Sequence, residues 1–331
     1  MRIPEFAYLR IVWILTGIWV CAPAHAEEPG FGEVLSAVVG VRAQIPEDAR
    51  TAEALGTERV GSGIVIDENG LVVTIGYLIL EATSVEILLP NDVTTPGRIV
   101  AYDHDTGFGL VRARTALGVH AMSLGNSQKL AESDQVLVAS FGGVETVRPA
   151  KVASRRVFAG YWEYLLDNAI FTAPAHPVFG GAALLDSDGS LLGVGSLAVS
   201  DAIPGHYMPG NMFVPIERFL PIMGDLLAHG RSTGKRRPWL GVYSEEVSGR
   251  VFVRRVADGG PAAAAGVESG DVILTVSDKP IRSMEDFYRN VWALGDAGVA
   301  VPITILKDSG PTRVTLKSVD RYQWLKLGHQ R

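Results

Sequence analysis

The chain contains many short runs of branched apolar residues, and most of these runs end at glycine, proline, asparagine or aspartate. Residues 60–79 form two such runs around Asp67-Glu68-Asn69-Gly70, and residues 182–199 form two more around Ser187-Asp188-Gly189. Asn-Gly and Asp-Gly supply the positive φ angles that a tight hairpin turn needs. Many short strands separated by turns predict an antiparallel barrel or sandwich. Further runs of this kind lie at 84–89, 97–101, 109–113, 135–140 and 150–157.

The pattern changes after residue 215. Apolar residues at 216–227 follow helical spacing, with Pro221 expected to delay the helix and Gly230 expected to end it. Residues 230–238 are polar, basic and poor in apolar side chains, which is typical of a linker.

The last third of the chain is again rich in predicted strands. One helix is expected over 283–294, with Ser283 as its N-cap. The pattern therefore predicts a mostly β chain with domains at 31–229 and 239–319 and a tail at 320–331.

Composition supports two folded domains. A chain of 331 residues is long for one ordinary domain, and its 47% hydrophobic content is sufficient for two cores. The formal net charge is -6, and the longest basic run is Lys235-Arg236-Arg237. This balance argues against nucleic acid as a partner.

The first 26 residues have the organisation of an export signal. Arg2 and Arg10 precede an apolar run at 11–20, and Ala24-His25-Ala26 is a small-x-small cleavage pattern. The run is short for a bilayer span, so we expect cleavage after Ala26, no stable membrane span, and a periplasmic or secreted protein. The only cysteine, Cys21, lies in this segment, so the mature chain would have no disulfide.

Four segments of the first domain carry its most distinctive motifs. They are Gly61-Ser62-Gly63-Ile64-Val65-Ile66-Asp67, then Gly70-Leu71-Val72-Val73-Thr74, and later the segments 105–111 and 177–182. Across residues 31–229 the chain resembles the trypsin-like domain of the HtrA/DegP family of periplasmic serine proteases. The resemblance implies a two-barrel, chymotrypsin-type fold.

The positions that the resemblance assigns to the catalytic triad carry other residues. Tyr77 follows Thr74-Ile75-Gly76 where the family has its histidine, Gly107 stands at the aspartate position, and Phe179 replaces the serine. Phe179 has no nucleophilic oxygen, Gly107 has no side chain, and a tyrosine with a pKa of about 10 is a poor base. One oxyanion donor of the family maps to Pro177, which has no N–H. We therefore expect no triad catalysis, and we expect Phe179 to pack against Tyr77 and seal the cleft.

The second domain resembles a PDZ domain of the HtrA type. The resemblance rests on Trp239-Leu240-Gly241-Val242, on residues 260–267 and 269–274, and on Lys279-Pro280-Ile281 before the predicted helix. It implies that backbone N–H groups of Trp239, Leu240, Gly241 and Val242 bind a peptide carboxylate while the peptide adds as a strand beside them. A PDZ domain that only docks on its own barrel would have the same sequence. We favour peptide binding over that alternative.

The predicted function is that of an HtrA-like pseudoprotease in envelope protein quality control. It would bind unfolded or C-terminal protein segments, as a chaperone-like scaffold or as a regulatory partner of an active HtrA-type protease in a homo- or hetero-oligomer. No cofactor and no metal site are predicted. Two alternatives stay open: an active serine endopeptidase with a non-standard site, and metal or small-ligand binding in the vacated cleft through His176, His206 or Tyr77.

Two further groups of residues are interpreted by their neighbours. His104 lies between Asp103 and Asp105, and we expect an exposed turn there rather than a metal site. Tyr161, Trp162 and Tyr164 cluster where the family places a loop that contacts substrate or the PDZ domain, and edge-strand packing is the competing interpretation.

Overall fold

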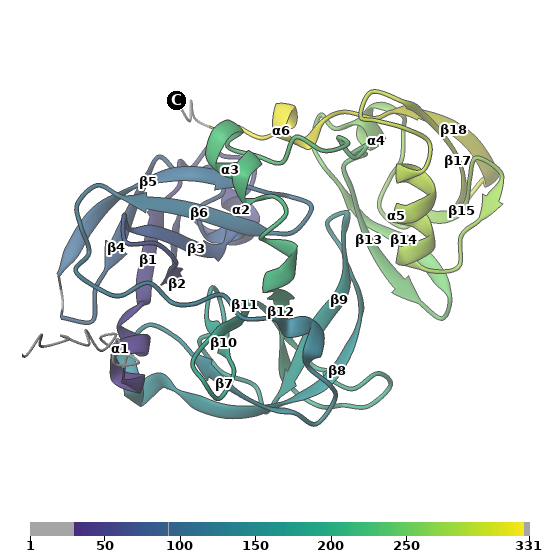
Figure 1. Ribbon diagram of the computed structural model, residues 1–331. Coiled ribbons are helices and arrows are strands. Elements are labelled where there is room, and N and C mark those ends of the chain that lie inside the picture. Colours follow the sequence, from purple (N-terminus) through teal and green to yellow (C-terminus); the bar gives the residue numbers. More distant parts are fainter. Residues whose placement is uncertain (1–29, 92, 328–331) are drawn as a thin grey trace, which may run out of the picture.

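The computed structural model describes residues 30–91 and 93–327, which form two closed six-stranded barrels and a separate six-stranded sheet (Figure 1). The prediction of a mostly β chain with two barrels and a further strand-rich domain is confirmed. The predicted export signal, Cys21 and the cleavage site at Ala26 lie outside the described residues.

The first barrel has the strand order β1-β2-β3-β6-β5-β4, and every pair is antiparallel. The predicted turn joins β2 to β3, with Gly70 at φ +71° and the Leu71 N–H donating to Asp67 Oδ1 over 2.7 Å. Its elements are α1 (Phe31–Ser36), β1 (Val38–Gln44), α2 (Ala52–Leu55), β2 (Glu58–Val65), β3 (Leu71–Ile75), η1 (Gly76–Leu78), β4 (Ser84–Leu88), β5 (Thr94–Tyr102) and β6 (Phe108–Ala113).

The second barrel has the order β10-β11-β12-β9-β8-β7, and a long hairpin of β8 and β9 extends from it. The predicted helix end is confirmed, because Gly230 takes the left-handed conformation at φ +73° directly after α3. Its elements are η2 (Ser127–Lys129), β7 (Gln135–Ala139), η3 (Gly143–Thr146), β8 (Arg148–Gly160), β9 (Tyr164–Ala173), β10 (Ala183–Leu185), β11 (Leu191–Val199), β12 (Gly210–Pro215), η4 (Ile216–Arg218) and α3 (Met223–His229).

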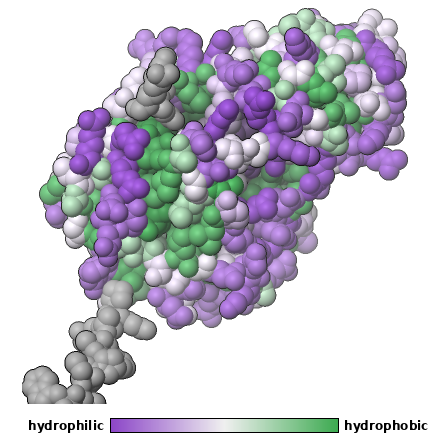
Figure 2. All heavy atoms as spheres, turned by 45° about the horizontal axis from the view of Figure 1, so that its top comes forward, coloured by the Kyte–Doolittle hydropathy of each residue, from purple (hydrophilic) through white to green (hydrophobic). Residues whose placement is uncertain are grey.

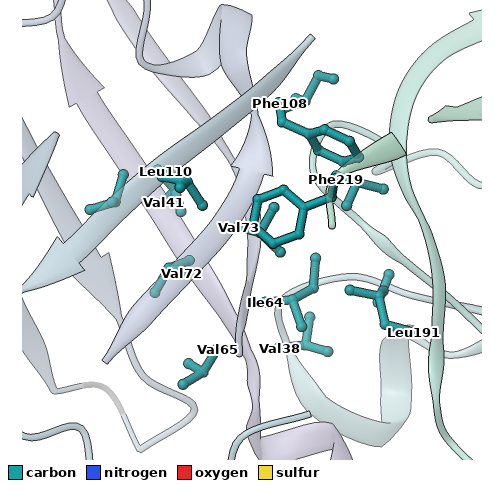
Figure 3. Packing of buried hydrophobic residues seen from close by; sticks show 14 of the residues in the cluster. Val38, Val41, Ile64, Val65, Val72, Val73, Phe108, Leu110, Leu191 and Phe219 are labelled. Atoms are coloured by element: carbon teal, nitrogen blue, oxygen red, sulfur yellow. The ribbon is translucent and has the colours of Figure 1, made fainter. Parts of the chain in front are cut away.

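One hydrophobic core runs through both barrels. Phe108 of β6 meets Phe219, which follows η4, edge to face with ring centroids 5.4 Å apart (Figure 3). Leu191 of the second barrel lies beside Ile64 and Val38 of the first barrel. The shared core fixes the orientation of the barrels, and therefore of the loops that meet between them.

The third domain is a twisted sheet with one longer helix. Ser283 caps that helix as predicted, since its Oγ accepts a hydrogen bond from the Asp286 N–H over 3.0 Å. Its apolar face buries Phe287, Tyr288 and Val291. The elements are β13 (Val242–Val247), β14 (Arg250–Val256), α4 (Pro261–Ala264), β15 (Val272–Val276), β16 (Lys279–Pro280), α5 (Met284–Trp292), β17 (Ala300–Lys307) and β18 (Gly310–Lys317).

The residues that follow this sheet return to the first barrel. We expected a tail from residue 320, but α6 (Arg321–Trp324) packs between the domains. The Trp324 ring lies 4.5 Å from that of Trp239, and the Lys326 N–H donates to Glu81 over 2.7 Å. Hydrophobic packing and a buried carboxylate together hold this segment in place.

The outer surface carries both hydrophobic and hydrophilic side chains. Figure 2 shows hydrophobic residues across the middle of one face, with hydrophilic side chains around them. Within residues 30–91 and 93–327, none of the helices is both long and apolar enough to cross a membrane.

Candidate functional site

The three positions that the resemblance assigns to the triad line one cavity of about 340 Å³. Tyr77 comes from η1, Gly107 from the turn before β6 and Phe179 from the loop before β10. The remaining walls come from both barrels, from β13 of the third domain and from α6. The fold thus brings together three residues that are far apart in the sequence.

Tyr77 is held as a hydrogen-bond donor. Its hydroxyl donates to the Ser196 carbonyl oxygen over 3.0 Å. Burial raises the pKa of Tyr77 well above its ordinary value of 10.0, because the phenolate would lose its hydration. A phenol that stays protonated and donates to the backbone cannot accept a proton from a nucleophile near neutral pH.

Gly107 occupies a position that suits glycine. Its φ is +86°, and a Cβ built there would lie 3.3 Å from the Tyr164 hydroxyl oxygen. The neighbouring carboxylates have other partners: Asp103 accepts from the N–H and hydroxyl of Thr106, and Asp105 lies 3.3 Å from Arg237. Burial raises the pKa of Asp105 to about 6, and Arg237 opposes that rise.

The loop that carries Phe179 is anchored through its backbone. The Phe179 carbonyl accepts from the Ala182 N–H over 3.0 Å, and the Gly180 carbonyl accepts from the Ser62 N–H over 2.8 Å. Gly181 is at φ +74°, and a Cβ there would lie 1.9 Å from the Ser62 carbonyl oxygen. The turn is rigid, while the side chain that it presents is apolar.

The loop at Trp239–Val242 contains an internal carboxylate. Glu163, in the tip of the β8–β9 hairpin, accepts hydrogen bonds from the N–H groups of Leu240, Gly241 and Val242 over 2.7 to 3.2 Å. Glu163 is buried at φ +59°. Burial raises the pKa of Glu163 to about 7, because it outweighs the hydrogen bonds from the loop N–H groups and the charge of Arg321, which both lower that pKa.

The rest of the hairpin tip lies in the groove between β13 and α5. The Tyr161 carbonyl accepts from the Ser244 N–H of β13 over 2.9 Å, and the Gly160 carbonyl accepts from the Tyr288 hydroxyl of α5 over 2.8 Å. Leu165 is buried in the core of the third domain. Figure 1 shows β9 reaching to β13. The hairpin thus places a carboxylate, main-chain acceptors and an apolar side chain where PDZ domains in general place a peptide.

Comparison with known proteins agrees on both domains. Residues 61–194 match the family model of the trypsin-like peptidase domain, and residues 238–317 match that of the PDZ domain. The chain is 26% identical over 295 residues to a probable periplasmic serine endoprotease, DegP-like, of Pseudomonas fulva, covering 82% of this chain and 59% of that protein. It is 25% identical over 328 residues to the periplasmic pH-dependent serine endoprotease DegQ of Escherichia coli, covering 88% and 70%.

The chain belongs to an HtrA-like family. Among solved structures, the HtrA-type protease AlgW with a tripeptide matches with a TM-score of 0.51 at 21% identity, covering 88% of this chain and 97% of that chain. The serine endoprotease from Yersinia pestis matches with a TM-score of 0.52 at 21% identity, covering 88% and 98%. These structures share the fold of the HtrA-like chain, which spans about 59% of the length of the Pseudomonas relative.

We expected Phe179 and Tyr77 to seal the cleft, and this prediction is wrong. Both side chains are only half-buried and line the same cavity, which stays open beside them. The Tyr77 hydroxyl is fixed on Ser196, and the Phe179 loop is fixed by its backbone.

Among the described histidines, His104, His176 and His206 have different surroundings, and His104 alone of the three lines the cavity. We expected His104 in an exposed turn, but it is buried, because Tyr322 and Arg321 of the C-terminal segment cover it. His176 is buried with both ring nitrogens in hydrogen bonds, to the Thr146 carbonyl and the Val178 N–H. His206 lies in an exposed loop, and neither it nor His176 lines the cavity. Within the described part of the chain, no three His, Cys, Asp or Glu side chains are grouped to hold a metal ion.

Two functional candidates escaped the sequence reasoning. Glu163 follows the predicted aromatic cluster, and its partners are 77 to 79 residues further along the chain. Arg321 lies in the expected tail, and its partner His104 is 217 residues away. The one local signal was the cluster itself: Trp162 stacks on Tyr164 with ring centroids 5.4 Å apart, and Tyr161 packs near Tyr243 at 6.2 Å.

Proposed function

We propose that this HtrA-like protein is a non-catalytic binder of protein segments, and that its PDZ loop receives a peptide carboxylate in place of Glu163. The observation that carries the proposal is the convergence of three loop N–H groups on one carboxylate. A loop that holds a side-chain carboxylate in this way has the donors that a peptide C-terminus requires.

The chemistry of the cavity supports a loss of proteolysis. Removing the triad of another serine protease costs about 10⁶ in turnover, and removing one oxyanion donor costs about 10² to 10³. Here Tyr77 is a committed donor, Gly107 and Phe179 supply no reactive atom, and Pro177 supplies no N–H. Ser196, Thr51 and His104 also line the cavity. Among the described residues, however, the His104 ring contacts Tyr102 and Arg321 and accepts no hydrogen bond from the hydroxyl of Ser196 or Thr51, so no nucleophile is paired with a base.

The hairpin acts in this proposal as an intramolecular competitor. A peptide can enter only when the Glu163 hairpin leaves the groove, so the apparent Kd is the intrinsic Kd divided by the fraction of open molecules. Three charge-assisted hydrogen bonds, each contributing about 1.5 to 3 kcal/mol, favour the closed arrangement against the hydration of the free carboxylate. Weakening the hairpin should therefore strengthen peptide binding.

Fluorescence polarisation with a labelled decapeptide that ends in leucine tests this idea. Leucine is chosen because Leu165 places that side chain in the core of the PDZ domain. We expect the peptide with a free carboxylate to bind, its C-terminal amide to bind at least tenfold more weakly, and Glu163→Ala to tighten the Kd at least tenfold. Glu132→Ala, an exposed glutamate outside the PDZ groove, is the matched control.

Two results would overturn peptide binding at this loop. One is equal affinity for the acid and the amide, which would mean that the loop does not read a carboxylate. The other is a Glu163→Ala variant that binds no better than the Glu132→Ala control although its melting temperature is unchanged.

We further propose a periplasmic role in envelope protein quality control, as a chaperone-like scaffold or a regulatory partner of an active HtrA-type protease in a shared oligomer. The names of the Pseudomonas and Escherichia relatives as periplasmic endoproteases support the compartment. A casein cleavage assay with fluorophosphonate labelling separates this role from that of an active endopeptidase. Turnover above a buffer control, or labelling of the purified protein, would refute the non-catalytic proposal.

A further inference from the structure

The cavity beside Phe179 has aromatic walls from three parts of the molecule. Tyr77 belongs to the first barrel, Trp162 and Tyr164 to the second, and Tyr243 to the PDZ domain. Leu55 of α2 lines the cavity as well and is 39% exposed. Such a lining favours the binding of a ligand with an apolar or aromatic group.

One buried charge lines the same cavity. Arg321 is only 8% exposed, and its Nη1 donates to the Trp162 carbonyl over 3.0 Å and lies 2.8 Å from Nε2 of His104. His104 is neutral, because burial and Arg321 hold its pKa well below 6.5. Among residues 30–91 and 93–327, Nε of Arg321 is buried without a hydrogen-bond partner, Nη2 has none either, and no carboxylate lies within ion-pair distance of the guanidinium.

A buried guanidinium without a counter-ion is costly, since the contacts of Nη1 replace its lost hydration only in part. The nearby carboxylate of Glu163 is committed to the PDZ loop. Two more arginines line the cavity and are exposed: Arg50 lies over Trp324, and Arg255 lies over Tyr243 at 3.9 Å. Neither has an ion-pair partner within the part of the chain that the structure describes. The positive charges of these three arginines could therefore be balanced by an anionic ligand in the cavity.

We propose that the cavity binds a small carboxylate with an aromatic or apolar body, with the carboxylate on Arg321 and the body against Trp162 and Tyr164. A volume of about 340 Å³ holds roughly eleven atoms of the size of a water molecule, at about 30 Å³ each. An arylpropionate has this size, and so has the end of a peptide that terminates in phenylalanine. The site borders the PDZ groove, because Trp162 precedes Glu163 in the tip of the same hairpin, and it is complete only while that hairpin is docked.

Calorimetry and tryptophan fluorescence of the full chain test the site with three probes. These are 3-phenylpropionate, its uncharged amide, and acetyl-Ala-Ala-Phe with a free carboxylate. We expect the acid to bind and the amide to bind at least tenfold more weakly, because a charge-assisted bond to a buried arginine contributes more than a neutral one. Binding by the tripeptide but not by the free acid, if it is weakened by Leu55→Trp, would identify a peptide end as the occupant of the cavity, and binding by the free acid alone would identify a small molecule.

Two variants and one control locate the site. Leu55→Trp narrows the cavity from an exposed position and should weaken binding at least tenfold without unfolding the chain. Arg321→Gln should abolish the preference for acid over amide, and Arg313→Gln, an exposed arginine of β18, should leave it unchanged. The proposal fails if neither carboxylate binds at 10 mM, if acid and amide bind equally, or if Leu55→Trp binds as the unchanged chain does. The Leu55→Trp result remains decisive if Arg321→Gln does not fold.

Discussion

The carboxylate in the PDZ loop makes the closure of that loop dependent on pH. Burial raises the pKa of Glu163 to about 7 in the docked arrangement, from an ordinary value of 4.5. When the hairpin leaves the groove, Glu163 meets water and its pKa returns toward the ordinary value. The docked arrangement therefore binds a proton that the open one releases.

The sign and size of the effect follow from this difference. A group with a higher pKa in the docked state stabilises that state while it is protonated, and this stabilisation is lost as the pH rises through about 7. At pH 6 about ten in eleven docked molecules carry the proton, at pH 8 about one in eleven, and the open form carries almost none at either pH. Docking should thus be about tenfold weaker at pH 8 than at pH 6, or ~1.4 kcal/mol.

Two other groups around Glu163 keep their charge across this interval. Burial raises the pKa of Tyr288 above its ordinary value of 10.0, and burial holds the pKa of His104 well below 6.5. A free peptide carboxylate with a pKa of about 3.5 stays ionised over the same interval. Asp105, next to His104, also titrates near this interval, since burial raises its pKa to about 6, so the Glu163→Gln variant is needed to isolate the contribution of Glu163.

The assay is the Kd of the labelled decapeptide at pH 6 and pH 8, at one ionic strength, for the unchanged chain, Glu163→Gln and Glu132→Gln. We expect the unchanged chain and the Glu132→Gln control to bind about tenfold more tightly at pH 8. Glu163→Gln is neutral at both pH values, so its Kd should change little. Hydrogen exchange of the Leu240, Gly241 and Val242 amides gives a readout of docking without the peptide.

Two outcomes would refute this reasoning. An equal Kd at pH 6 and pH 8 would mean that the three loop N–H groups and Arg321 outweigh burial and hold the pKa of Glu163 below this interval. An unaltered pH change in Glu163→Gln would mean that a different group titrates.

Three further changes probe the docking contact, the strained turn and the shared core. Tyr288→Phe removes the hydrogen bond to the Gly160 carbonyl, so docking should weaken by about 0.5 to 1.5 kcal/mol and the amides of the PDZ loop should exchange faster. Gly107→Ala places a Cβ at φ +86° near Tyr164, and denaturant unfolding should show a loss of about 1 to 2 kcal/mol. Phe219→Ala leaves a cavity in the core common to both barrels, and the same measurement should show a loss of about 3 to 5 kcal/mol.

Local signals in the sequence predicted most of the fold. The turn at Asn69-Gly70, the cap at Ser283 and the stop at Gly230 are each decided by residues within a few positions, and each is found in the structure. The family motifs then bring Tyr77 and Phe179 to one cavity, although they are about a hundred residues apart in the chain.

The contacts that complete both candidate sites depend on packing between domains. Glu163 has no local partner, and in the sequence it is one charged residue after two aromatic ones. Arg321 becomes buried only because the C-terminal segment returns across the first barrel and covers His104. Hydrophobic periodicity describes the buried face of one element, and it does not report which distant element will cover a polar residue.

The same geometry indicates how a peptide could displace its intramolecular competitor. The hairpin gains from proximity, since a tethered ligand acts at an effective concentration near the millimolar range. Yet among the described residues its main chain makes one hydrogen bond to β13, from the Ser244 N–H to the Tyr161 carbonyl. An extended peptide can pair along β13 from Val242 to Val247 and gain several main-chain bonds, each contributing about 0.5 to 1.5 kcal/mol. The groove should therefore select extended chains that end in a carboxylate, because a carboxylate alone only repeats what Glu163 already provides.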